Sequence, residues 1–242
     1  MKRVLIIPIM CVFLCPGCTE KEEKTLEVNP SSIIVYSEGT QQLTTNVDDA
    51  SFITKDDYYA TVSTTGLVTG ERVGSTEIIV KSSIGSYEVP IKILNKYSLY
   101  PDVDRLIGKN ISDMVNLFGS DYKTSTTSSG AMMYGYANPT RYVELIAFTM
   151  NGSTIKSVGV VVPTSYTSML TKYLLERYMV AGMQNDMYFF LNHDENVMIG
   201  LEVYSSQYLM VIYVDATSSK ASNTNTYFFQ YREIYNESII NQ

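Results

Sequence analysis

Short apolar runs fill the chain from Thr25 to Leu94, and their spacing limits the possible folds more than any other feature of the sequence. Glycine, asparagine, aspartate and serine interrupt these runs at close intervals. Apolar runs of a few residues between turn-forming residues are typical of β-strands, and a succession of them at this spacing favours a β-sandwich. The sequence therefore predicts a small all-β domain at residues 25–94.

The stretch over residues 59–80 shows the pattern in most detail. Strands at 60–62 and 67–69 flank a turn at Gly66, and a longer strand begins at Gly74. Both glycines fall at tight connections that need a positive φ, which glycine adopts at little cost because it has no Cβ.

Several motifs of this region resemble those of bacterial immunoglobulin-like domains of group 2, namely Asn29-Pro30-Ser31, Gly39-Thr40-Gln41-Gln42-Leu43, Ala60-Thr61-Val62, Gly66-Leu67-Val68-Thr69 and Gly74-Ser75-Thr76-Glu77-Ile78. The family often has a tryptophan before the Ala-Thr-Val motif. This chain has none, so we expect Phe52 or Ile53 to fill that core position. The resemblance implies a stalk or adhesion-type module of a surface protein. Such a module serves as a spacer, which we favour, or binds a ligand itself.

The chain begins with Met1-Lys2-Arg3 and an apolar run from Val4 to Leu14. A basic start, a short apolar run and small residues before a cleavage site are typical of a secretory signal peptide. The run is too short to cross a bilayer, which takes about 20 apolar residues. We therefore expect residues 1–17 to be removed.

The motif Leu14-Cys15-Pro16-Gly17-Cys18 resembles a bacterial lipobox. The resemblance implies cleavage before Cys18 and attachment of lipid to its sulfur, which would anchor the protein to a membrane. Leucine usually lies three residues before the modified cysteine, where this chain has Cys15, so Cys15 competes for the lipid. A plain signal peptide is the other alternative. Cleavage before Cys18 leaves no other cysteine, which excludes disulfides and cysteine-based zinc sites from the mature domains.

Residues 18–24 form a charged tether. A similar acidic run directs lipoproteins of some Gram-negative anaerobes to the outside of the outer membrane, so the resemblance implies an outer-membrane lipoprotein at the cell surface. The alternative is a solvated linker. Cleavage removes two of the 18 basic residues and none of the 25 acidic ones, which leaves a formal charge of −9. We expect no nucleic-acid partner, because nucleic-acid binding depends on clustered basic residues.

A linker is predicted at residues 95–101 and a second domain at 102–242; from Tyr97 onward the chain holds 16 of its 20 tyrosines. Helical spacing predicts a helix capped by Asn110 and ended by Gly119, and another from Ser165 to Gly182. Strands are predicted near residues 131–137, 141–150 and 154–162, and near 187–192, 197–204, 207–215 and 226–234. A loop is expected at 123–130 and a hairpin turn at Asn151-Gly152.

This order predicts an α+β domain in which two α-β-β-β units share an antiparallel sheet, with the helices on one face. Similar unit orders occur in tandem-repeat inhibitor domains and in small outer-membrane assembly lipoproteins.

If the helices cover one face of the sheet, the other face is open. The strand near residues 207–215 is apolar on both faces, and an open face with tyrosine and methionine would suit a ligand. The candidate ligand-contacting residues are Tyr204, Tyr208, Met210 and Tyr213. The alternative is that these side chains are core or dimer contacts.

The only histidine, His193, lies in the polar run 192–196, which is typical of a hairpin turn rather than a metal or acid–base site. Carboxylate pairs occur at Asp48-Asp49, Asp56-Asp57 and Asp102/Asp104. A glycosidase needs two carboxyls held across a cleft, which spacing alone does not establish. We predict no catalytic residue, no metal site and no cofactor.

These features predict a non-enzymatic, lipid-anchored protein of the cell envelope. In this hypothesis an immunoglobulin-like spacer presents a C-terminal domain that binds a protein or a glycan. The alternatives are an inward-facing periplasmic lipoprotein that inhibits or scaffolds an envelope complex, and a hydrolase that uses only carboxylates.

Overall fold

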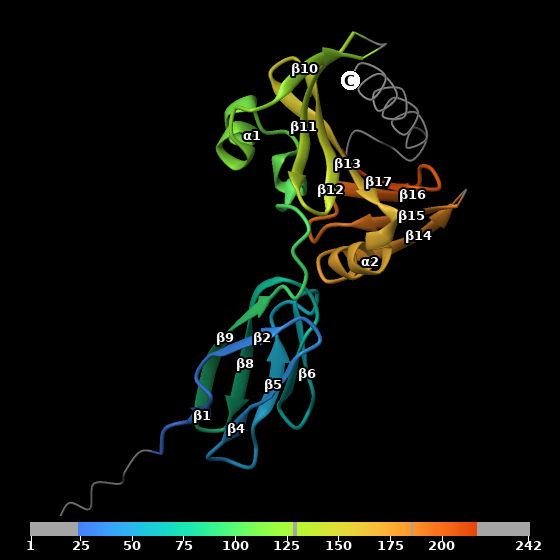
Figure 1. The fold of residues 1–242 in the computed structure, drawn as a ribbon. Helices are drawn as coiled ribbons and strands as arrows, with labels where there is room; N and C mark the ends of the chain where they lie inside the picture. The colour runs from blue at the N-terminus through green and yellow to red at the C-terminus, as the bar shows by residue number, and fades with distance from the viewer. Residues whose placement is uncertain (1–23, 128–129, 185, 217–242) are drawn as a thin grey trace, which may run out of the picture.

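The N-terminal domain, residues 24–94, is a sandwich of short strands that lies end to end with the C-terminal domain, residues 99–216 (Figure 1). The computed structural model describes residues 24–127, 130–184 and 186–216. One sheet of the sandwich has the strand order β2-β9-β8-β5, the other has β3-β7-β6, and β1 pairs with β4. The bounds are β1 Val28–Asn29, β2 Ile33–Tyr36, β3 Thr40–Gln42, β4 Thr44–Thr45, β5 Ser51–Thr54, β6 Ala60–Val62, β7 Leu67–Gly70, β8 Gly74–Ser82 and β9 Gly85–Leu94.

Alternate side chains of the strands fill the core of the sandwich. Along β9, Val89, Ile91 and Ile93 are buried, because successive residues of a strand point to opposite faces. Phe52 packs against this core, whereas Ile53 is 49% exposed. Of the two candidates for the core position, the structure therefore selects Phe52.

The C-terminal domain is a single antiparallel sheet with the order β10-β11-β12-β13-β17-β16-β15-β14. The strands are β10 Lys123–Thr126, β11 Met132–Thr140, β12 Val143–Asn151, β13 Thr154–Pro163, β14 Met179–Gln184, β15 Met187–Leu191, β16 Val197–Val203 and β17 Tyr208–Asp215. The described residues add only two short α-helices, α1 (Ile111–Phe118) and α2 (Thr167–Leu175), and the 3-10 turns η1 (Val103–Leu106) and η2 (Thr164–Tyr166). The predicted α+β class is therefore corrected to a mainly β domain.

The predicted repeat is present, and within the described residues each unit has four strands, whereas the predicted unit is α-β-β-β. Helix α1 precedes the meander β10–β13, and α2 precedes β14–β17. The first extra strand, β10, lies in the predicted loop and pairs with β11. Its exposed polar side chains are typical of an edge strand, so its sequence resembles that of a loop.

Local signals for the first helix and the hairpin are confirmed. The Asn110 side chain accepts a hydrogen bond from the Asp113 N–H at 3.2 Å, and Gly119, with φ 83°, ends the helix. Strands β12 and β13 form the predicted hairpin, with Gly152 at φ 60° in its turn.

The second helix ends earlier than predicted. Helix α2 stops at Leu175, and residues 179–184 form β14 instead of further helical turns. Glu176 and Arg177, which follow the helix, contact the N-terminal domain and the start of the C-terminal domain. These long-range contacts override the local helical pattern.

Both faces of the large sheet carry buried apolar side chains. Val211 and Tyr213 belong to a cluster that includes the buried residues of α1 and α2. Met210 and Ile212 belong to a separate cluster, as the alternation along β17 requires. The expectation that the second face is open is therefore wrong.

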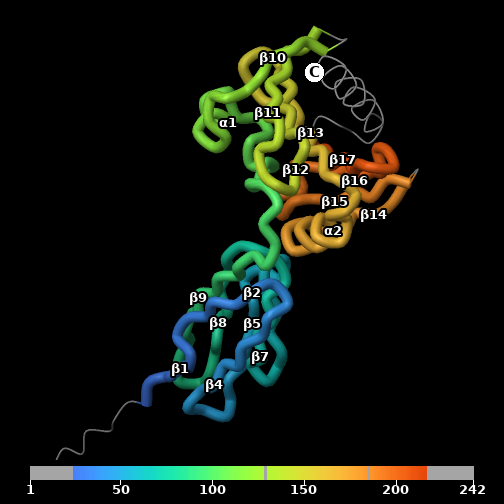
Figure 2. The backbone as a smooth tube through the Cα atoms, viewed as in Figure 1, coloured from blue at the N-terminus to red at the C-terminus, as the bar shows by residue number. Residues whose placement is uncertain are grey.

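Residues 95–98 form the short connection between the domains (Figure 2). Leu99 and Tyr100, which were predicted to be part of the linker, are 1% and 5% exposed and belong to the C-terminal core. The predicted signal peptide, Cys18 and the strand near 226–234 lie outside the described residues. No helix within the described ranges is both long enough and apolar enough to cross a membrane.

Candidate functional site

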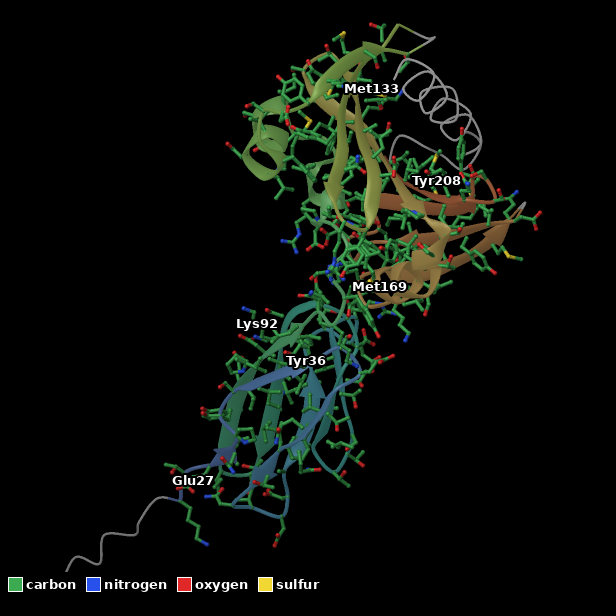
Figure 3. All side chains as sticks on the ribbon, in the orientation of Figure 1. Glu27, Tyr36, Lys92, Met133, Met169 and Tyr208 are labelled. Carbon is green, nitrogen blue, oxygen red and sulfur yellow. The ribbon has the colours of Figure 1, made fainter. Side chains whose placement is uncertain are left out.

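The ligand-contacting residues predicted from sequence lie in different environments. Tyr213 is 0% exposed, with its hydroxyl 2.9 Å from that of Tyr100, and Met210 is 1% exposed. Both side chains are enclosed rather than on an open face, and their contact with a ligand stays a prediction. Tyr204 and Tyr208 are partly buried against the cluster of Met210, and their contact with a ligand stays a prediction. Figure 3 shows Tyr208 away from the junction of the two domains.

Glu176 joins both domains and the connection through a buried carboxylate, an arrangement we call the Glu176 contact. Ser37 Oγ and the Lys96 N–H donate to Oε2 at 3.1 and 2.9 Å, and the Tyr97 N–H donates to Oε1 at 3.1 Å. The Val73 N–H donates to the Glu176 carbonyl at 2.8 Å. Hydrogen bonds to a charged acceptor are strong, and their convergence fixes one docked arrangement of the domains.

Arg177 compensates the buried charge of Glu176. Its guanidinium contacts Glu176, donates to Asp102 Oδ1 at 2.9 Å and lies 3.9 Å from the centroid of the Tyr173 ring. The hydroxyl of Tyr58, from the N-terminal domain, donates to the Arg177 carbonyl at 2.7 Å. A buried ion pair is stable only when its remaining polar atoms are satisfied. The Arg177 guanidinium makes such further bonds to Asp102 and, at 3.3 Å, to the Tyr173 carbonyl.

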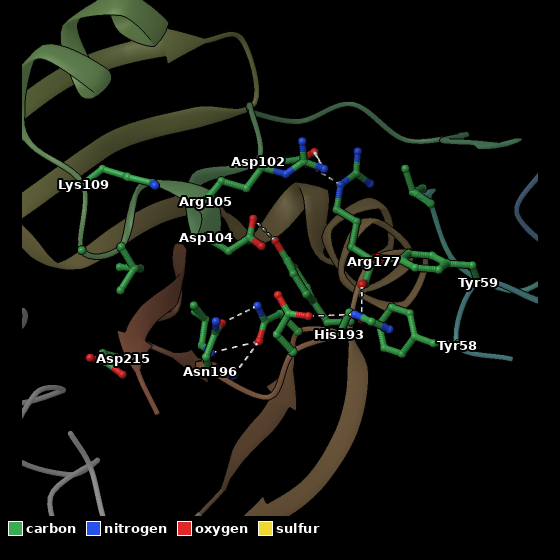
Figure 4. A pocket seen from close by; sticks show the side chains of 17 residues that line it. Tyr58, Tyr59, Asp102, Asp104, Arg105, Lys109, Arg177, His193, Asn196 and Asp215 are labelled. Atoms are coloured by element: carbon green, nitrogen blue, oxygen red, sulfur yellow. Dashed lines mark hydrogen bonds and ion pairs between the residues drawn. The ribbon is translucent and has the colours of Figure 1, made fainter. Parts of the chain in front are cut away.

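A cavity of about 520 Å³ lies beside these contacts, between the two domains (Figure 4). This volume falls within the range of roughly 300–1,000 Å³ that small-molecule sites occupy. The N-terminal domain supplies one wall; η1, the end of α2 and the β15–β16 turn supply the other. The lining residues are Tyr58, Tyr59, Val73, Asp102, Asp104, Arg105, Ile107, Gly108, Lys109, Arg177, Tyr178, Asn192, His193, Asp194, Asn196, Val197 and Asp215.

His193 lies in the β15–β16 hairpin turn, as predicted, and also reaches the other domain. Its Nε2 lies 2.7 Å from Asp56 Oδ2, and its Nδ1 lies 2.9 Å from Asp194 Oδ1; we call this the His193 contact. The ring stacks on Tyr59 at 5.0 Å and meets the edge of Tyr58 at 4.9 Å. The hydrogen bonds with Asp194 and Asp56 raise the pKa of His193 above its ordinary value of 6.5, although desolvation lowers it.

Asp104 is a partly buried carboxylate on the cavity wall, and its pKa is shifted. Burial raises the pKa of this carboxyl, while the hydrogen bond donated by the Tyr178 hydroxyl at 3.0 Å lowers it in part. A carboxyl that keeps its proton at higher pH than usual can donate as well as accept a hydrogen bond. Within the described ranges, no group of three or more His, Cys, Asp or Glu side chains could hold a metal ion.

The family model of the bacterial Ig-like domain (group 2) matches residues 24–93. This segment is a bacterial Ig-like domain of group 2. The match ends where the sandwich ends, so the name applies to the N-terminal domain alone. Among curated proteins, none matches the chain.

Several solved structures are similar to the chain at low scores. The crystal structure of an EHEC O157:H7 intimin mutant has 16% identity and a TM-score of 0.25, over 55% of this chain and 93% of that one. Domains 5–6 of the S-layer protein SbsC have 13% identity and a TM-score of 0.26, over 81% of this chain and 86% of theirs. Scores of this size do not establish a shared overall fold.

The Ig-like domain contributes residues to the cavity that sequence reasoning did not single out. Of the predicted carboxylate pairs, Asp102 and Asp104 line the cavity, and Asp56 contacts His193. Asp49 instead accepts a hydrogen bond from the Ser83 N–H, within the Ig-like domain. One feature of the sequence could have indicated a role for Arg177: it is a charged residue in a stripe of otherwise apolar and aromatic residues at helical spacing.

Proposed function

We propose that this protein is a lipid-anchored, non-enzymatic protein of the bacterial cell envelope that binds an acidic saccharide between its two domains. Lipid on Cys18 holds it to the outer membrane, and the charged tether marks it for the cell surface. The Ig-like domain serves as a spacer and supplies one wall of the binding cavity. The family of residues 24–93 supports the surface location, and the two-domain cavity is the observation that supports the ligand.

The cavity wall offers donors and acceptors that the junction does not use. Among the described residues, the Tyr59 hydroxyl and the Asn196 Nδ2 have no hydrogen-bond partner. Asp104 and Asp194 use one oxygen each in the contacts with Tyr178 and His193, and a carboxylate has about four lone-pair sites. A concave surface with such groups beside aromatic rings suits the hydroxyls of a sugar.

Two cations on the wall are available to an acidic group of a ligand, beside a wall that also carries the carboxylates of Asp104 and Asp215. Arg177 is balanced by the carboxylates it contacts, and so is His193 when it carries a proton. Arg105 is 77% exposed and lies 3.7 Å from Asp102, and Lys109 has no ion pair among the described residues. These cations lie on the surface of a chain whose net charge is −7, so a carboxylate on the sugar would find its counter-charge here.

Saturation-transfer NMR with the chain from Thr19 onward tests the ligand. We expect D-glucuronate to bind and D-glucose to bind more weakly. Lys109→Gln should weaken glucuronate binding several-fold, whereas Lys123→Gln, which changes an exposed lysine of β10, should not. Equal binding of inorganic phosphate would reduce the site to a general anion site. Absence of saccharide binding would contradict the proposal.

Protease treatment of intact and lysed cells tests the location. We expect the C-terminal domain to be degraded in intact cells, and Glu22→Ala with Glu23→Ala to prevent this by removing the acidic signal. Protection of the unchanged protein until lysis would favour the inward-facing alternative. Cleavage of an acidic oligosaccharide that is lost in Asp104→Asn would favour the carboxylate-only hydrolase.

A further inference from the structure

His193 is the only histidine of the sequence, and its imidazole ring joins the two domains. We propose that the imidazolium form of His193 ties Asp56 of the Ig-like domain to the C-terminal domain, and that loss of its proton loosens this side of the junction. The inference concerns the docking of the domains and does not depend on whether the cavity binds a saccharide.

Donor counting supports the proposal. A neutral imidazole has one N–H donor and one lone pair, whereas the imidazolium has donors on both nitrogens. Nε2 and Nδ1 both lie within 2.9 Å of carboxylate oxygens, and ionised carboxylates only accept. The observed pair of contacts is therefore complete only when the ring carries two protons. In the neutral ring, one nitrogen lone pair would face an oxygen lone pair.

The groups around the ring also favour the cation. Asp194, from its own turn, and Asp56, from the segment between β5 and β6, are the nearest charges. Tyr59 stacks against the ring, and Tyr58 meets it edge-on. The Tyr58 ring also contacts the Arg72 guanidinium, which lies 4.7 Å from its centroid. The remaining charged or titratable side chains that line the shared cavity are Asp102, Asp104, Arg105, Lys109, Arg177, Tyr178 and Asp215.

Deprotonation would weaken the contact between domains while leaving the Glu176 contact in place. Asp194 is adjacent to His193 in sequence, so its contact persists by connectivity. Asp56 is 137 residues away, and only the docking of the domains holds it near the ring. The contact with Asp56 is therefore the one that can separate when the ring gives up its second proton.

The single histidine makes the test direct, because a protein purified without a histidine tag shows one imidazole Hε1 signal. Titration of that signal by NMR should give a pKa above 6.5 for the unchanged chain from Thr19 onward. Asp56→Asn removes the charge across the junction and should lower this pKa. Asp57→Asn, one residue away and exposed, is the matched control and should leave it unchanged. An unchanged pKa in Asp56→Asn would overturn the proposal.

A distance measurement tests the loosening itself. With Ser86→Cys and Ser206→Cys as spin-label sites, one exposed residue in each domain, the electron–electron distance distribution should broaden as the pH rises from 5.5 to 8.5. In Asp56→Asn the amide can donate to a neutral ring, so the broadening should be reduced. A distribution that is independent of pH in the unchanged chain would show that the Glu176 contact alone sets the docking, against the proposal.

Discussion

The two domains meet through two contacts with opposite physical character. The Glu176 contact is buried, combines side-chain and backbone donors, and has its charge balanced by Arg177. The His193 contact is 38% exposed at the ring and depends on a proton. The comparison shows that one junction can combine a permanent connection with an adjustable one, because burial decides whether a charge can change state at ordinary pH.

Glu176→Ala should produce the largest effect. It leaves Ser37, Arg177 and the Lys96 and Tyr97 N–H groups without their buried acceptor, and breaking such a pair typically costs about 3 kcal/mol or more. Chemical denaturation should show this loss. Glu38→Ala is the control, because Glu38 pairs with Lys96 at the surface with 86% of its side chain exposed. A loss below about 1 kcal/mol in Glu176→Ala would show that the contact does not hold the domains together.

Tyr58→Phe should lower the stability less than Glu176→Ala does, and it tests the same buried part of the junction. It removes the hydrogen bond to the Arg177 carbonyl and should lower the free energy of unfolding by about 1 kcal/mol. Tyr36→Phe, at a tyrosine that is 55% exposed, should change it little. Equal effects of the two substitutions in denaturant titrations would argue against a role for the Tyr58 hydroxyl.

His193→Gln should lower the melting temperature modestly, by an amount that depends on pH. Because the folded-state pKa of His193 is raised, its stabilisation is fully present below the ordinary value of 6.5 and is lost as the pH rises through the raised pKa. The melting temperature of the variant should therefore fall furthest below that of the unchanged protein at pH 5.5, and the difference should shrink by pH 8.5. A difference in melting temperature that grows with pH would contradict a stabilising role for the protonated ring.

Asp104→Asn should have the smallest effect, and it should be stabilising. Burial raises the pKa of Asp104, so the cost of its charge is absent at low pH and appears as the pH rises through the raised pKa. Asparagine keeps the oxygen that accepts from Tyr178 without the charge. Its melting temperature should exceed that of the unchanged protein at pH 7 and approach it at lower pH. The exposed Asp121→Asn should show no such trend.

The elements that the sequence predicted are those set by neighbouring residues. Asn110 and Gly119 bound a helix, Asn151-Gly152 turns a hairpin, and Gly66 has the positive φ expected of it. A Cβ at Gly66 would also lie 2.9 Å from the Phe52 ring, so the position requires glycine on two grounds. Signals of this kind act over a few residues and can be read without the fold.

The candidate site could not be predicted, because its residues meet only after the domains dock. Ser37 and Glu176 are 139 residues apart, and neither has a local pattern that indicates the other. The early end of α2 has the same cause, since the helical periodicity continues to Tyr178 while the contacts of Glu176 and Arg177 end the helix. The burial of Met210 and Tyr213 was not predicted, because alternation along a strand does not show that both faces of the sheet are buried.

The antiparallel pairing of β13 with β17 joins the final strands of the two repeated units, with Gly159 opposite Ile212 and Val160 opposite Val211. A unit released from its companion would expose that strand along its length and could regain the lost hydrogen bonds by pairing with a second copy of itself, as in a twofold dimer. Linking the units in one chain replaces an equilibrium that depends on concentration with an intramolecular one. The sheet is therefore complete at any dilution.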